Sequence, residues 1–86
     1  MHTLTVRLTN HPSPLEPAVI PGGFIEEELR VDMLDMEEII NKIEPMVEAI
    51  ENHENTTIGV LVRKEDGGIV LHGTVQNGSF HGVGMS

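Results

Sequence analysis

The chain has 86 residues and a formal net charge of −9, and it contains no cysteine, tryptophan or tyrosine. This length allows one domain near the lower limit of independent folding, and the lack of cysteine excludes disulfides and thiolate zinc sites. No apolar run approaches the roughly 20 residues that cross a bilayer, and residues 1–4 form no secretory leader. We expect a single cytoplasmic domain over residues 1–86, whose small aliphatic core favours a homo-oligomer.

The net charge lies entirely between Glu26 and Glu54, where eleven acids face the two bases Arg30 and Lys42. Such a field repels phosphate backbones and anionic lipids, so we expect no direct binding to nucleic acid or membranes. A basic protein surface would be attracted and would associate faster at low salt. The alternative is that the acids only keep a small protein soluble.

Two strands and a long loop are predicted before the acidic helix. Strict alternation over residues 3–9 predicts a half-buried strand with its leucines and valine inward. Residues 10–23 hold four of the five prolines and predict an irregular loop. Its length leaves three alternatives: a functional loop, an arm that reaches a neighbouring subunit, or a simple crossover on the surface. Residues 28–33 alternate again, with Leu29, Val31 and Met33 between charged residues, and predict a second strand, although the acids before Leu29 have helical propensity.

A helix over residues 36–52 is the clearest predicted element. Its apolar residues recur with a helical period at Met36, Ile39, Ile40, Ile43, Met46, Val47 and Ile50. Asp35 is a suitable N-cap, and Glu38 completes a pattern like a capping box. Pro45 removes one backbone donor inside the apolar stripe, so we expect a kink in a helix that continues through it.

A β-hairpin is predicted from residues 57–64 and 69–76, which flank an Asp66-Gly67 dipeptide. A two-residue turn at this dipeptide would align the apolar residues of both strands on one face. The other face would carry Leu61 and Val70, which suggests cover by a second sheet or subunit. The glycine-rich tail, residues 77–86, is expected to be disordered at its end or to close over a site.

The hairpin and tail supply a possible ligand-binding group: Arg63, His72, Phe80 and His81. The five histidines lack a compact zinc spacing, Ser79 lacks the surroundings of a nucleophile elbow, and the glycines lack the lysine of a phosphate loop. We therefore expect a protein that is not an enzyme and that has no catalytic residue, metal ion or cofactor.

Together these elements predict an α+β fold, in which a small antiparallel sheet of β-β-α-β-β order packs against one kinked amphipathic helix. The candidate partner-binding residues form its outer acidic face: Glu37, Glu44, Glu48 and Glu51. They stand about 4.5–10 Å apart along the axis, which is similar to the phosphate spacing of a nucleic-acid strand.

Our first hypothesis is therefore a non-enzymatic acidic interaction protein. It would inhibit a basic protein partner by mimicking nucleic acid, and small acidic inhibitors of mobile elements or phages have a similar composition. The alternative is a homo-oligomer that binds or sequesters a small-molecule ligand, with residues 10–23 or 77–86 forming the site at a subunit interface.

Overall fold

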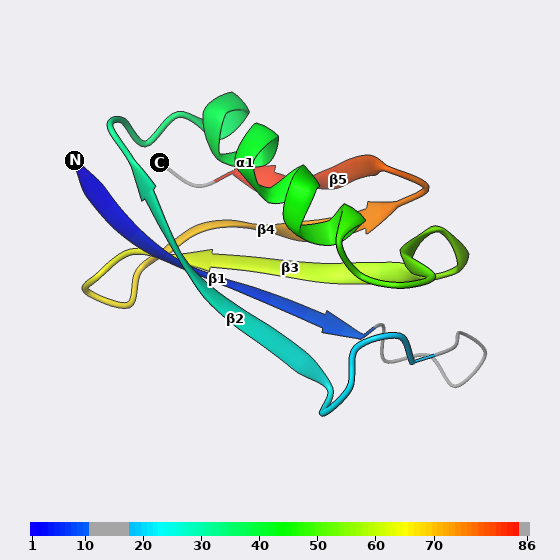
Figure 1. The fold of residues 1–86 in the computed structure, drawn as a ribbon. Helices are drawn as coiled ribbons and strands as arrows, with labels where there is room; N and C mark the ends of the chain where they lie inside the picture. Colours follow the sequence, from blue (N-terminus) through cyan, green and yellow to red (C-terminus); the bar gives the residue numbers. More distant parts are fainter. Residues whose placement is uncertain (11–17, 85–86) are drawn as a thin grey trace.

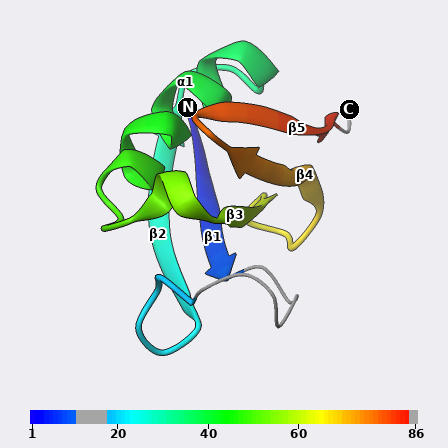
Figure 2. The same ribbon diagram turned by 90° about the vertical axis from the view of Figure 1, so that its right-hand side faces the viewer.

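The computed structural model describes residues 1–10 and 18–84, which form a five-stranded antiparallel sheet with one helix against one face (Figures 1 and 2). The elements in chain order are β1 (His2–Asn10), β2 (Phe24–Val31), α1 (Met36–Glu48), the 3₁₀ turn η1 (His53–Asn55), β3 (Thr57–Arg63), β4 (Ile69–Gln76) and β5 (Ser79–Gly84). The strand order is β2-β1-β3-β4-β5. The expected α+β class is confirmed, but the predicted element order omitted β5.

The core lies between α1 and the face of the sheet that the helix covers. Leu4, Val6 and Leu8 of β1 are buried there, as the alternation predicted, and Ile39 and Ile43 of α1 are fully buried against them. The opposite face of β1 carries Thr and Arg side chains that are partly or fully exposed. The strand pattern therefore reflects a sheet with one covered face and one open face.

The helix begins where the sequence predicts and ends four residues early. The Asp35 carboxylate accepts a hydrogen bond from the Glu37 amide at 3.4 Å, so the predicted N-cap is confirmed. α1 continues through Pro45 to Glu48, while the kink at Pro45 stays a prediction. The chain then turns, and Asn52 adopts a left-handed conformation with φ of 65°, which a continuing helix does not allow.

β2 begins four residues earlier than predicted and ends at Val31. Its acidic residues pair with β1, as in Arg7 opposite Glu26, so strand pairing outweighs their helical propensity. The pairing stops where β1 starts, with His2 opposite Val31. Met33 lies beyond this point and is 67% exposed, so the predicted end of the strand at residue 33 is two residues too late.

The hairpin register is confirmed over most of β3 and β4, but its predicted two-residue turn is wrong. Lys64 and Gly68 close a three-residue loop, in which the Lys64 amide donates to the Gly68 carbonyl at 2.8 Å and Gly67 takes a φ of 90°. A bulge at Val70 compensates for the extra residue, because Val62 pairs with Leu71 whereas Arg63 pairs with Ile69. Val70 is therefore buried beside Leu71, and its expected place on the open face is wrong.

The tail forms an edge strand, β5, which pairs with β4. Residues 85–86 lie outside the described part of the chain. Phe80 packs against the core, and its ring covers two paired glycines, Gly73 and Gly82. A Cβ atom would meet this ring at 3.0 Å from Gly73 and at 2.7 Å from Gly82. An aromatic ring that covers glycines in this way restores packing that the glycines cannot supply.

Substitution of Gly82 with Ala would place a Cβ atom 2.5 Å from the His72 carbonyl of β4 and 2.7 Å from the Phe80 ring. It should lower the free energy of unfolding by about 1–3 kcal/mol, the usual range for an overpacked site. Thermal unfolding followed by far-UV circular dichroism measures this loss. Ser79→Ala on the same strand is the control, because Ser79 is exposed and its truncation creates no clash. Equal stability of the two variants would contradict the close packing around Gly82.

Candidate functional site: an acidic helix face beside an apolar pocket

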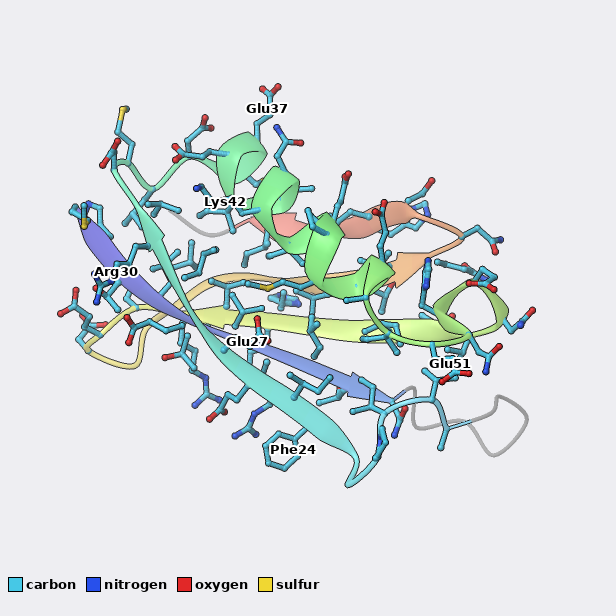
Figure 3. The ribbon with its side chains drawn as sticks, viewed as in Figure 1. Phe24, Glu27, Arg30, Glu37, Lys42 and Glu51 are labelled. Carbon is cyan, nitrogen blue, oxygen red and sulfur yellow. The ribbon has the colours of Figure 1, made fainter. Side chains whose placement is uncertain are left out.

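Three of the four predicted carboxylates, Glu37, Glu44 and Glu48, recur on one flank of α1. Glu51 follows the last turn, and Figure 3 shows Glu37 and Glu51 at opposite ends of the helix. Ile39, Ile43 and Val47 of α1 are buried, whereas Glu37 and Glu48 are exposed and Glu44 is half-buried. We call the set Glu37, Glu44, Glu48 and Glu51 the acidic stripe.

The acidic stripe has no opposite charge paired with it among residues 1–10 and 18–84. The ion pairs in these ranges join Arg7 to Glu26 at 2.7 Å, Arg30 to Glu28 at 3.2 Å, and His53 to Glu54 at 3.3 Å. Lys42, the basic residue of α1, is exposed and contributes to none of these pairs.

The position of the acidic stripe opposes helix stability. Glu44 and Glu48 are like charges one turn apart, which repel each other. The last turn of α1 carries no basic residue, although the helix dipole favours cations there and disfavours Glu48. The carboxylates therefore form an uncompensated anionic field that a bound cation would relieve.

An apolar pocket of about 500 Å³ opens between the second half of α1 and the ends of β1 and β2. Its lining consists of Leu8, Val19, Pro21, Ile25, Glu27, Pro45, Met46, Ala49, Ile50 and Glu51. This volume lies within the usual range for ligand pockets, which are mostly apolar with a few polar groups. The two charged lining residues are both carboxylates, Glu27 and Glu51.

The pocket exists because α1 leaves part of the helix-facing side of the sheet uncovered. Glu27 pairs with Val6 and Ile25 pairs with Leu8, so Glu27 and Ile25 face the same side as these buried residues. Glu27 is nevertheless exposed and Ile25 is only partly buried. Because β2 is an edge strand, an inward carboxylate also discourages pairing with another sheet.

Asn10 fixes the loop segment that forms one wall of the pocket. Its side-chain oxygen accepts hydrogen bonds from the Val19 and Ile20 amides, both at 2.9 Å, and its amide group donates to the Ile20 carbonyl at 3.0 Å. Ile20 is buried and Val19 packs against the core, while Ala18 is exposed. Residues 11–17 of the predicted loop lie outside the described residues.

The possible ligand-binding group of the hairpin and tail is not brought together. Arg63, His72 and His81 are exposed, and the two histidines lie diagonally on neighbouring strands of the open face, because His72 pairs with Val83. Phe80 packs against the core on the other side of the sheet. The structure therefore does not bring these four residues together, and their role in binding a ligand stays a prediction.

The open face offers little enclosure. Its cavity beside Arg63 and Arg7 has a volume of about 20 Å³, which is room for one water molecule. Arg7 already forms an ion pair with Glu26, and its guanidinium lies 4.7 Å from the centre of the Phe24 ring. A small-molecule site is better supported at the apolar pocket, which the sequence did not reveal.

Searches for other kinds of site and for relatives give negative results. In the ranges 1–10 and 18–84, no group of three His, Asp or Glu side chains is placed to hold a metal ion. The helices of the same ranges are too short or too polar to cross a membrane. Comparisons with protein-family models, curated protein sequences and solved structures find no match.

Proposed function

We propose that this protein is a non-enzymatic interaction protein that binds a basic partner through the acidic stripe. The observation that carries the proposal is the set of four carboxylates along and just after α1, none of which forms an ion pair within residues 1–10 and 18–84. A partner with lysine or arginine side chains would neutralise the repulsion within this set, and charge complementarity would also accelerate the encounter. Binding in a groove that otherwise holds nucleic acid would make the protein an inhibitor.

Replacement of all four carboxylates with glutamine should abolish salt-sensitive capture of basic proteins from an extract of the source cell. The expected loss is large because the substitutions remove the whole acidic stripe while leaving the buried face of α1 intact. Immobilised wild-type and variant proteins are compared by mass spectrometry of what they retain at low and high salt.

The matched control removes four exposed carboxylates elsewhere, at Glu28, Asp32, Glu54 and Glu65. It changes the net charge by the same amount and should retain the basic partner. If both quadruple variants lose the partner equally, capture depends on net charge and the stripe has no specific role. If neither variant loses it, the proposed function is wrong.

A second candidate function is a homo-oligomer that binds a small molecule, and the apolar pocket is the observation that favours it. A ligand that binds the folded state raises the melting temperature by mass action. A thermal-shift screen of metabolites measures this effect, and light scattering reports the oligomeric state. A ligand of submillimolar affinity together with no basic partner would favour this alternative.

A further inference from the structure

The outer edge of β5 is an unpaired side of the sheet within residues 1–10 and 18–84. β5 is the last strand in the order β2-β1-β3-β4-β5, and its pairing with β4 runs without a register shift. The edge carries no charge, because the sequence contains no Asp, Glu, Lys or Arg after Asp66. Proteins usually protect an exposed edge with charges, proline or a bulge. Because β5 has none of these, its edge is suited to accept another strand.

The turn before β5 determines which of its backbone groups point outward. Residues 77–78 form a two-residue turn with φ of 52° and 78°, closed by the Gln76–Ser79 pair. Hydrogen-bonded and non-hydrogen-bonded pairs alternate along an antiparallel ladder, so every second residue from Ser79 onward bonds to β4. The amides and carbonyls of Phe80 and Gly82 therefore face away from β4 and are free to pair with an added strand.

The two flanks of α1 face opposite edges of the sheet. Met46 and Ala49 line the apolar pocket together with residues of β1 and β2, so this flank faces the β2 edge. Glu37, Glu44 and Glu48 recur on the other side of the buried line of the helix. Because β2 and β5 are the two edges of the sheet, these three carboxylates lie toward the β5 edge. Figure 3 shows Glu37 pointing outward beyond β5.

The apolar side of α1 continues past the sheet at the same edge. In both ribbon views the first turn of α1 lies beyond β5, on the side away from β4 (Figures 1 and 2). Met36, the first residue of α1, is 39% exposed, and Ile40 one turn later is only partly buried. Ile43 and Val47, later members of the same apolar stripe, are buried. The start of α1 therefore presents apolar surface where a sixth strand would lie.

These features together select an extended basic segment as the occupant. An extended chain satisfies the outward amides and carbonyls of β5, as in peptide recognition by strand addition. Its side chains alternate between two faces, so apolar ones cover Met36 while lysine or arginine reaches Glu37 and Glu44. A second copy of β5 would bring another acidic stripe to the same edge, and the two stripes would repel each other.

We propose that the basic partner adds an extended segment to the outer edge of β5 as a sixth strand beside the start of α1. This inference rests on the proposed function and deepens it, because it names the place and the conformation of the bound segment. Backbone hydrogen bonds hold the segment in register, and the acidic stripe selects its charge.

Two heptapeptides of equal charge test this binding mode, Ac-KVKVKVK-NH₂ and Ac-KVKPKVK-NH₂. The central proline removes a backbone donor and interrupts strand pairing. The valine peptide should therefore bind roughly tenfold more tightly than the proline peptide, which corresponds to the loss of one or two backbone hydrogen bonds.

Amide hydrogen exchange measured by NMR locates the added strand. The valine peptide should slow exchange at Phe80 and Gly82, whose amides point outward. The amide of His81 points toward β4 and is the internal reference. The methyl resonance of Met36 should also move, whereas that of Met46 on the pocket flank should stay in place.

Gly84→Pro removes the next outward amide, because Gly84 follows Gly82 by two residues on β5. This variant should weaken the valine peptide roughly tenfold. Gly84→Ala retains the amide and is the matched control, so its affinity should exceed that of Gly84→Pro. Unchanged exchange of the His81 amide verifies that β5 still pairs with β4 in both variants.

The possible outcomes separate the inference from the proposed function. Salt-sensitive binding of both basic peptides with equal affinity, or binding that leaves exchange at Phe80 and Gly82 unchanged, overturns strand addition and leaves the proposed function intact. No binding of either peptide at low salt overturns the inference, while capture by the glutamine variant of the acidic stripe decides the proposed function separately.

Two other occupants of the edge would also be recognised, and each would overturn the inference. Equal binding of Ac-EVEVEVE-NH₂ would show that the edge accepts any extended chain regardless of charge. A dimer in light scattering, with slow exchange at Phe80 and Gly82 in the absence of peptide, would show that a second copy pairs with β5. The expected result is a complex of one protein chain with the valine peptide.

Discussion

Replacement of Asn10 with Ala is expected to lower the free energy of unfolding by about 2–3 kcal/mol, because it removes three hydrogen bonds at once. The Val19 and Ile20 amides and the Ile20 carbonyl lose their partner in a partly buried position, and an unsatisfied buried group costs about 1–3 kcal/mol. Urea unfolding measured by far-UV circular dichroism is suitable, since the chain lacks tryptophan and tyrosine.

Asn41→Ala is the matched control for this prediction, because Asn41 is exposed on α1 and alanine is the better helix former. Asn10→Asp is a finer comparison. It retains an oxygen that accepts from the two amides, but places a second oxygen against the Ile20 carbonyl, so it should remain less stable than the wild type. If Asn10→Ala and Asn41→Ala have the same stability, Asn10 does not hold the loop.

Replacement of Ile43 with Ala should have a still larger effect, about 2–5 kcal/mol, because it opens a cavity in the centre of the core. Ile43 is fully buried between α1 and the sheet. A core in so small a scaffold rarely contributes more than roughly 3–5 kcal/mol in total. We therefore expect Ile43→Ala to be largely unfolded at room temperature, which the loss of the far-UV signal would show.

Ile43→Val provides a measurable folded variant at the same position, with an expected loss of about 0.5–1.5 kcal/mol. Met36→Ala is the control on the same helix, because Met36 is 39% exposed and its truncation leaves no enclosed cavity. Similar losses for Ile43→Val and Met36→Ala would contradict the central position of Ile43 in the core.

The helix and the strands β1, β3 and β4 could be predicted from the sequence because their burial mostly follows a single period. The alternation in β1 and the helical repeat of α1 indicate which side of each element faces the core. The register of β3 and β4 could be predicted for the same reason. Its turn was misjudged, because a bulge at Val70 compensates for the longer loop and nothing in the local pattern indicates a bulge.

β5 and the pocket could not be predicted because they depend on contacts between distant segments. The sequence around Gly82 lacks the β-branched and aromatic residues typical of strands, and its pairing depends on the edge of β4 and on the ring of Phe80. The pocket depends on how much of β2 the helix leaves uncovered. Asn10 could be recognised as a loop residue, but its three bonds require the folded position of Val19 and Ile20.

The places of Glu37, Glu44 and Glu48 along α1 follow from the helical repeat, whereas the role of the acidic stripe in binding stays a prediction. Its meeting with the pocket at Glu51 could not be predicted, because Glu27 reaches the pocket from another element. The homo-oligomer predicted from the small core stays a prediction.

The strand order has a consequence for how quickly the chain folds. In the described ranges, the β1–β2 hairpin and the β3–β4–β5 meander are joined into one sheet by the β1–β3 pair, in which Leu8 lies opposite Val60. Each half can close over a short stretch of chain, whereas the central pair must close a loop that contains β2 and α1. Long loops lose more entropy on closure and slow the search for native contacts. We therefore expect closure of the β1–β3 pair to set the folding rate.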